Sequence, residues 1–346
     1  MRPSSNKNQF RMQIVNKSAL VRLAILFAVL LILGAWAGLT MFWMPEHSYN
    51  GKLQPLQNEE IALQTSLKRD IQKIADEIGV RNVSQYENLN AAKTFLETAL
   101  TEAGYEVKLQ EYQINNKSYY NLEVERLGTE KPNEIVLIGG HYDSAFTSPG
   151  ANDNGTGAVA TLELARIFAQ KSTKRTVRFV EFTNEEPPFF WTENMGSLVY
   201  AQRSRQNQEN IVAMLSLETM GYFSDTVGSQ KYPFPINLFY PNQGNFIAFI
   251  GNLNSGNLVR QAIKSFRRYA EFPSEGVSLP SWIPGVGWSD QWAFWQQGYQ
   301  GIMITDTAPY RYPYYHTEED TPDKIDFDKL TRVVAGLAEV ISDLAE

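Results

Sequence analysis

The sequence predicts an α/β fold of three layers, in which helices flank a mainly parallel, mixed central sheet. Short apolar runs at 134–140, 177–183, 211–217 and 301–305 are typical of buried strands. Helical stretches separate several of these runs, and an amphipathic helix over 330–344 closes the chain. Strands that alternate with helices favour a parallel sheet, because each parallel pair needs a crossover connection.

The remaining elements follow from local patterns. Apolar residues recur at helical spacing in four further stretches, and a segment rich in Tyr and Val alternates partly, as paired strands do. These predict helices near 59–79, 89–103, 155–169 and 196–206, and a hairpin within 105–125.

Residues 223–290 interrupt the alternation of predicted strands and helices. They are rich in Pro, Gly, Asn and aromatic residues. We expect an insertion of strands and loops there, with one helix near 257–269, that extends over the edge of the sheet.

The N-terminal region predicts a membrane segment. Leu23 to Met44 is a run of 22 residues without a charge, and as a helix it would reach roughly 33 Å, enough to span a bilayer. Every charge in 1–22 is basic, so the positive-inside rule leaves this end in the cytoplasm. We therefore expect a cytoplasmic arm (1–22), a signal anchor (23–44), a linker (45–58) and an extracytoplasmic domain (59–346).

Two other interpretations of this segment remain open. Ala35-Trp36-Ala37 fits a small-x-small cleavage site, so the segment would be a signal peptide cleaved near Ala37 and the body would be secreted. A buried helix of a soluble domain is the third interpretation. The first two both export the body.

Composition limits the chemistry. There is no Cys, which excludes disulfides and thiolate zinc sites. A metal would need His and carboxylate ligands, which suit catalytic zinc. Outside residues 1–22, which carry five basic residues and no acid, the chain has 31 − 5 = 26 basic and 38 acidic residues, a net charge of −12. Such an acidic body argues against nucleic acid as a partner.

His141 is one of three histidines, and we assign no role to His47 beside the membrane segment. His141 ends the apolar run at 134–140, where a parallel sheet binds ligands. Asp143 follows two residues later and is expected to accept the second ring N–H of His141, which would orient the metal-binding nitrogen. A structural histidine at a strand end is the alternative.

Two further stretches offer carboxylates. Asp153 lies in the glycine-rich turn Gly150-Ala-Asn-Asp-Asn-Gly-Thr-Gly157, which opens a helix. It would either cap the helix or bridge two cations, and an Asp at that place argues against a phosphate loop. Glu185 and Glu186 follow the next strand, where adjacent carboxylates resist burial unless a cation compensates them. One could bind metal while the other acts as a base.

Glu218 ends another apolar strand, and His316 precedes the last helix within Tyr314-Tyr-His-Thr-Glu-Glu-Asp-Thr-Pro-Asp323. The acids of this loop are interpreted as capping and surface residues. Each motif is weak alone, but together they put metal ligands at four strand ends or loops of one α/β chain.

The order of these motifs resembles the M28 metallopeptidases. His-x-Asp, Asn-Asp-Asn-Gly, Glu-Glu, an acid at a strand end and Tyr-His-Thr-x-x-Asp-Thr follow one another as in that family, which includes bacterial zinc aminopeptidases and has the glutaminyl cyclases as relatives. The resemblance covers roughly residues 85–345. Ser289-Asp-Gln-Trp-Ala-Phe294 is similar to the family's Ser-Asp-rich segment.

This resemblance implies a zinc aminopeptidase-like fold and two co-catalytic zinc ions. Asp153 would bridge the ions, His141 and Glu218 would complete one site, and Glu186 and His316 the other. Many members have Asp at the position of Glu218.

It also implies the catalytic roles. Glu185 would be the general base, and Tyr315 would help to stabilise the oxyanion. The activity implied is hydrolysis of N-terminal peptide bonds, with peptides as substrates. A glutaminyl cyclase-like acyltransferase, which generally uses one zinc, and a non-catalytic binding module on the same scaffold are the alternatives.

Overall fold

The computed structural model describes residues 17–346, which divide into two units between Trp43 and Met44. Most of the basic arm predicted at 1–22 lies outside the described residues. The helices are α1 (Lys17–Ala37), α2 (Asn58–Gln72), α3 (Tyr86–Glu102), α4 (Gly157–Phe168), α5 (Gly196–Gln206), α6 (Gly256–Tyr269), α7 (Gln291–Gln296), α8 (Ala308–Arg311) and α9 (Phe327–Leu344). The strands are β1 (Lys108–Ile114), β2 (Lys117–Arg126), β3 (Lys131–His141), β4 (Arg175–Phe182), β5 (Asn210–Glu218), β6 (Ser224–Val227), β7 (Gln243–Gly244), β8 (Ile247–Asn252), β9 (Ser274–Leu279) and β10 (Gly301–Thr305).

The described part of the N-terminal unit consists of one apolar helix and Trp43. The helix comprises α1 and the π-helical turn η1 (Gly38–Phe42), and it begins before the predicted boundary at residue 23. The span Ser18–Phe42 has a mean hydropathy of 2.5, is long enough to cross a membrane and contributes no buried residue. The helix therefore does not behave as the core helix of a soluble domain, whereas a membrane span or a signal sequence fits it.

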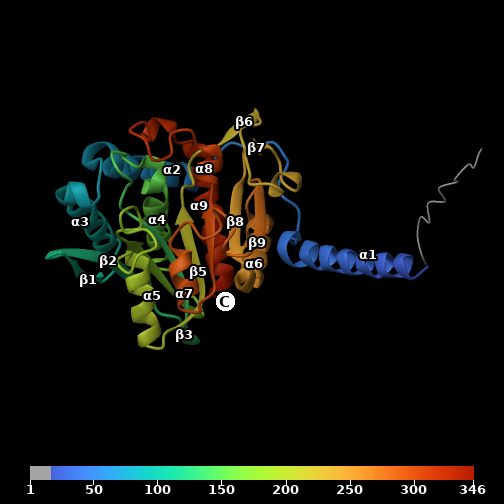
Figure 1. The fold of residues 1–346 in the computed structure, drawn as a ribbon. Coiled ribbons are helices and arrows are strands. Elements are labelled where there is room, and N and C mark those ends of the chain that lie inside the picture. Colours follow the sequence, from blue (N-terminus) through green and yellow to red (C-terminus); the bar gives the residue numbers. More distant parts are fainter. Residues whose placement is uncertain (1–16) are drawn as a thin grey trace, which may run out of the picture. The chain divides into compact units, whose positions relative to one another are not determined.

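The second unit is built on an eight-stranded sheet in the order β1-β2-β4-β3-β5-β10-β8-β9 (Figure 1). The four central strands β4, β3, β5 and β10 are parallel, and β1 and β2 continue one edge in antiparallel pairing. At the other edge β8 is antiparallel to β10, and β9 is parallel to β8. The predicted mixed, mainly parallel sheet is confirmed.

Both faces of this sheet are buried, because alternate residues of each central strand enter two different cores. In β3, Val136 and Ile138 belong to the larger core, beneath α2, α3, α4, α6 and α9. Ile135 and Leu137 point to the smaller core, beneath α5 and α7. Apolar side chains on both faces explain the unbroken hydrophobic run of this strand and confirm the three-layer arrangement.

The start of α4 is held very close to the sheet. A Cβ atom on Gly157 would lie 2.2 Å from the carbonyl oxygen of Leu217 in β5 and 2.3 Å from Oδ1 of Asn154. The N–H of Gly157 donates to that same Oδ1 at 3.0 Å. Only glycine permits this approach, which draws the turn before α4 against the end of β5.

Region 223–290 supplies the sheet's second edge. The helix predicted near 257–269 is present as α6, and it packs on β8 and β9. No long helix covers the opposite face of these two strands within the described chain; loops and the four-residue helix α8 lie over it instead. The largest, residues 228–242, joins β6 to β7 and is closed by the N–H of Gly228 donating to the carbonyl of Asn242 at 2.9 Å. We call it the aromatic loop.

The segment predicted as a linker is fixed to the second unit at its first residues. Arg267 of α6 donates to the carbonyl oxygens of Pro45 and Glu46 at 3.1 and 3.0 Å. The N–H of Ser274, the first residue of β9, donates to Oγ of Ser48 at 2.9 Å. The chain that follows the apolar helix is thus attached to the edge strand β9 almost immediately.

The contact at Gly157 predicts a stability loss. In Gly157→Ala the new methyl group must displace α4 or β5, so we expect the free energy of unfolding to fall by about 1–3 kcal/mol, as in other overpacked sites. Gly287→Ala is the control, because its Cβ would meet nothing nearer than 3.4 Å. Urea unfolding of both variants measures the difference, and equal midpoints would contradict the analysis.

Candidate metal centre

The predicted ligands come from the carboxyl ends of adjacent parallel strands. His141 is the last residue of β3 and Glu218 the last of β5. Glu186 follows β4 by four residues, and His316 lies in the loop after α8, beyond the end of β10. Asp153 lies in the π-helical turn η4 (Ala151–Thr156), just before α4. The structure therefore brings all five side chains to one edge of the sheet, as the sequence predicts.

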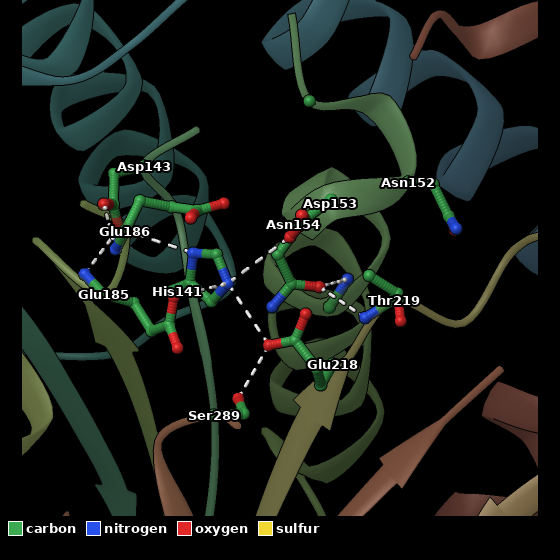
Figure 2. Close-up of polar contacts among 12 residues, drawn as sticks. His141, Asp143, Asn152, Asp153, Asn154, Glu185, Glu186, Glu218, Thr219 and Ser289 are labelled. Atoms are coloured by element: carbon green, nitrogen blue, oxygen red, sulfur yellow. Dashed lines mark hydrogen bonds and ion pairs between the residues drawn. The ribbon is translucent and has the colours of Figure 1, made fainter. Parts of the chain in front are cut away.

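Asp153 lies between the two histidines. Its Oδ1 is 3.7 Å from Nε2 of His141 (Figure 2). Its Oδ2 is 2.9 Å from Nε2 of His316. Each histidine also faces a glutamate: Oε1 of Glu186 is 3.3 Å from His316, and Oε2 of Glu218 is 3.2 Å from His141. The arrangement consists of two sets of ligands that share one carboxylate.

These residues fit divalent cations. Ligand atoms of His141, Glu185 and Glu218 lie within 4.8 Å of one another, and so do those of His141, Asp153 and Glu186. Both ring nitrogens of His141, Oδ2 of Asp153 and Oε1 of Glu186 are buried without a hydrogen-bond partner among the described residues. Buried polar atoms that lack partners are costly, and nitrogen and carboxylate donors suit zinc.

The cluster takes up protons when no cation is bound. Burial, and then the charge of Asp153, raise the pKa of Glu186 to about 8. Burial opposes the charged imidazole of His316, but the close carboxylates of Asp153 and Glu186 outweigh that effect and raise its pKa to about 10. At neutral pH two predicted ligands therefore carry protons that a metal would have to displace.

Asp143 has a wider role than predicted. Its Oδ1 is 3.4 Å from Nδ1 of His141, too poorly directed for the hydrogen bond that the sequence suggests. Its two oxygens instead accept the backbone N–H groups of Glu185 and Glu186, at 3.1 and 3.0 Å (Figure 2). One buried carboxylate thus fixes the chain that presents both glutamates and lies beside the histidine of the neighbouring strand.

Asp320 corrects the interpretation of its loop as capping and surface residues. It is fully buried, and its carboxylate accepts the N–H groups of Asn152 and Asp153, at 2.8 and 3.0 Å. The hydroxyl of Tyr312 donates to it at 2.7 Å, and burial raises its pKa to about 6. Asp320 therefore holds the turn of Asp153, a role that its neighbourhood of exposed acids concealed.

Arg81 was missed by sequence reasoning. Its side chain is fully buried and donates to three carbonyl oxygens of the loop between His141 and the Asp153 turn: those of Tyr142 at 2.6 Å, Gly150 at 2.8 Å and Pro149. A lone arginine between two helical stretches gives no sequence signal for such a role. Arg81 is far from every proposed ligand in the sequence, yet its side chain supports the loop that joins two of them.

Two hydrogen bonds support Glu218. Oγ of Ser289, in the Ser-Asp segment, donates to Oε2 of Glu218 at 2.6 Å (Figure 2). Oδ1 of Asn154 accepts the N–H of Thr219 at 3.0 Å, so the turn beside Asp153 also fixes the chain just after Glu218. The sequence pattern contains both residues but predicts neither contact.

Tyr315 lies beside the cluster. Its ring stacks on His316 with the centroids 3.8 Å apart. Burial and the charges of Asp153, Glu186 and the other carboxylates raise its pKa well above 10. The phenol therefore keeps its proton at neutral pH and is available as a hydrogen-bond donor.

An apolar pocket adjoins the cluster at Glu218 and Tyr315. It is a hollow of about 830 Å³, open to solvent, on the sheet face that no long helix covers. Its only charged lining residue besides Glu218 is Glu275, which is 3.9 Å from Arg267. The floor comes from β8, β9 and β10 and the roof from the aromatic loop and neighbouring loops, through Ala248, Ile250, Val277, Leu279, Met303, Tyr232, Pro233, Ile236, Tyr240 and Val286.

Sequence comparison identifies relatives over most of the chain. The sequence model of Peptidase family M28 matches residues 121–341. An uncharacterized protein of Escherichia coli K12, YfbL, is 33% identical over 284 residues, which are 80% of this chain and 86% of that protein. An aminopeptidase of Pseudomonas aeruginosa is 35% identical over 171 residues, 45% of this chain and 29% of that longer protein.

Structural comparison finds the same fold in distant proteins. The zinc aminopeptidase of Bacillus subtilis superposes with a TM-score of 0.66 at 14% identity, over 85% of this chain and 96% of that one. The glutaminyl cyclase of Fimbriiglobus ruber superposes with a TM-score of 0.60 at 18% identity, over 85% and 98%. The fold is therefore shared by hydrolases and cyclases.

The raised pKa values predict proton release on zinc binding. The pKa values of Glu186, His316 and His141 are all raised, so zinc should displace protons from these ligands, and its apparent affinity should rise about tenfold per pH unit for each proton displaced. Calorimetry in buffers of different ionisation enthalpy counts the protons. His316→Ala should release about one proton fewer. Binding without proton release would contradict this description of the cluster.

Proposed function

The chain belongs to peptidase family M28 and is a metallo-aminopeptidase, and we propose that it hydrolyses N-terminal peptide bonds with two zinc ions held side by side. Family membership supports the zinc peptidase activity. The number of ions and the role of each residue are proposals that rest on the arrangement of side chains at the strand ends.

The position of Asp153 carries this proposal. One of its oxygens faces His316 at 2.9 Å and the other faces His141 at 3.7 Å, while Glu186 and Glu218 complete the two sets. A single cation needs neither the second histidine nor the shared carboxylate. We therefore assign His141 and Glu218 to one zinc, Glu186 and His316 to the other, and Asp153 to both.

Zinc in these positions would lower the pKa of a water molecule and polarise the carbonyl of the scissile bond. Glu185 is the proposed general base: it is buried, 3.7 Å from His141, and its backbone is fixed because its N–H donates to the carboxylate of Asp143. It would take a proton from the water and pass it to the leaving amine. Tyr315 would donate a hydrogen bond to the carbonyl oxygen as negative charge develops there.

The apolar pocket supports a preference for N-terminal residues with large apolar side chains. It opens beside Glu218 and Tyr315, where the side chain next to the scissile bond would lie. Glu275 does not make it a site for basic residues, because Arg267 compensates that carboxylate. Burial of an apolar side chain in such a pocket yields binding energy in proportion to its area.

A glutaminyl cyclase-like activity is the alternative that the fold allows. Cyclases generally use one zinc, whereas this chain carries two histidines and three carboxylates around a shared aspartate. A non-catalytic module would not require Glu185 to be buried beside the ligands. The complete cluster therefore favours hydrolysis over both.

We further propose that Ser18–Phe42 anchors the enzyme in a membrane, with the N-terminus in the cytoplasm and the catalytic unit outside it. From Leu23 to Phe42 the helix carries no charge, and every charge before Leu23 is basic. The expected substrates are then peptides outside the cytoplasm.

Zinc titration of the chelated enzyme tests the proposed function. Hydrolysis of N-terminal leucyl, phenylalanyl, alanyl, lysyl and glutamyl reporter substrates should be lost on chelation and should return in proportion to added zinc until about two ions are bound per chain. The leucyl and phenylalanyl reporters should react fastest.

Elemental analysis of the same samples checks the stoichiometry. Full activity at one zinc per chain, together with cyclisation of N-terminal glutamine, would favour the cyclase. No hydrolysis of any aminoacyl reporter would remove the basis for the peptidase proposal.

Two matched substitutions separate the adjacent glutamates. Glu185→Gln keeps the size of the side chain and removes the base, so kcat should fall roughly 10²–10⁴-fold while zinc content stays near normal. Glu186→Gln removes a charged ligand, so zinc binding should weaken first and activity should partly return at high zinc. Kinetics and elemental analysis of both variants measure this. The reverse pattern would exchange the two roles.

A further inference from the structure

We infer that the outer surface of the aromatic loop lies in the headgroup layer of the membrane that holds the N-terminal helix, so that the catalytic unit rests on the bilayer. The inference rests on the proposed membrane span and goes beyond the proposed activity. The partner is the lipid surface itself.

The aromatic loop exposes large apolar side chains. Phe234, Leu238 and Phe239 are 83%, 69% and 59% exposed, within six residues of sequence. Single exposed apolar residues are ordinary, but several together on one loop mark a surface that meets another apolar phase. Aromatic and leucine side chains are those that favour the membrane interface.

The aromatic loop has an inner surface that lines the pocket and an outer surface that is exposed to solvent. Tyr232, Ile236 and Tyr240 lie on the inner one and line the roof of the apolar pocket. Phe234 and Leu238 alternate with them and point to solvent. The pocket therefore accounts for the inner side chains but not for the exposure of Phe234 and Leu238.

The loop lies close to the place where the chain leaves the apolar helix. The hydroxyl of Tyr240 donates to the carbonyl of Gly276 in the edge strand β9 at 2.7 Å. Met44, two residues after Phe42, packs on that same glycine: a Cβ atom there would lie 3.0 Å from the Met44 sulfur. Met44, the first residue of the catalytic unit, and the aromatic loop thus meet at Gly276.

This proximity limits how far the loop can be from lipid. Phe239 is adjacent to Tyr240, so it is separated from Gly276 by about one side-chain length and one Cα–Cα step of 3.8 Å. Met44 follows the span directly, and the interfacial layer of a bilayer is roughly 5–8 Å deep on each side. Hydrogen bonds fix the linker to the catalytic unit at Pro45, Glu46 and Ser48, so the linker adds little distance between the span and that unit. The outer side chains are therefore within reach of that layer.

The loop's composition favours lipid over a charged partner. Lys231 is its only ionisable residue apart from tyrosines. Contact with the bilayer should therefore depend on apolar burial, with little sensitivity to salt or to anionic lipid.

Single cysteines can test the inference because the chain has none of its own. Leu238→Cys and Phe234→Cys place an environment-sensitive fluorophore on the loop. Leu127→Cys is the matched control, because Leu127 is also a leucine, is 65% exposed and directly follows β2, near the opposite edge of the sheet from β9. The full-length variants are reconstituted into phosphatidylcholine vesicles, some of them containing nitroxide-labelled lipid.

We expect the labels at 234 and 238 to shift their emission to the blue and to lose intensity with nitroxide lipid, whereas the label at 127 does neither. High salt should not reverse the effect. If all three labels behave alike while carbonate extraction leaves the chain in the membrane, the loop does not touch lipid and the inference is wrong.

Two other outcomes would also overturn it. Extraction of the whole chain by carbonate would remove the anchor on which it rests, without affecting the peptidase activity. A signal at 234 and 238 that responds to an aminopeptidase inhibitor but not to nitroxide lipid would make the loop a lid over the pocket instead.

Discussion

Buried negative charge is the constraint on which the catalytic unit depends. Asp153, Glu185, Glu186 and Glu218 are gathered at one edge of the sheet with almost no exposure, and an uncompensated buried carboxylate costs several kcal/mol. The two histidines cannot balance four carboxylates at neutral pH unless some of these retain protons. The proposed pair of divalent cations would remove this cost.

The surrounding structure is organised to hold that charge in place. Asp320 and Asp143 each use a carboxylate to accept two successive backbone N–H groups, one pair in the Asp153 turn and the other at Glu185 and Glu186. Arg81 secures the intervening loop through its carbonyl oxygens. The ligands are therefore positioned by the backbone beneath them, and a metal can bind without first ordering the chain.

The candidate metal ligands and the apolar pocket lie on different halves of the sheet. Parallel strands β4, β3, β5 and β10 bring their carboxyl ends together and carry the metal cluster. Strands β8 and β9, from the region expected to be an insertion, widen the sheet and leave one face free of long helices. The pocket occupies that face, and the aromatic loop roofs it beside the point where the linker meets β9. Substrate selection and attachment to the membrane are thus proposed for the same half of the unit.

Much of this protein was determined by local sequence. Strand and helix periodicity predicted the layers, because alternate burial leaves its pattern in the chain, and the five ligands stood out because polar residues at strand ends interrupt apolar runs. The roles of three other residues could not be predicted: Arg81, Asp320 and Ser289. Their partners lie far away in sequence, from about 60 residues for Arg81 to 168 for Asp320. Only the folded chain decided which carboxylate is buried, which backbone N–H it holds, and that the aromatic loop and Met44 meet at Gly276. Such choices depend on long-range packing, and residue type alone carries no record of it.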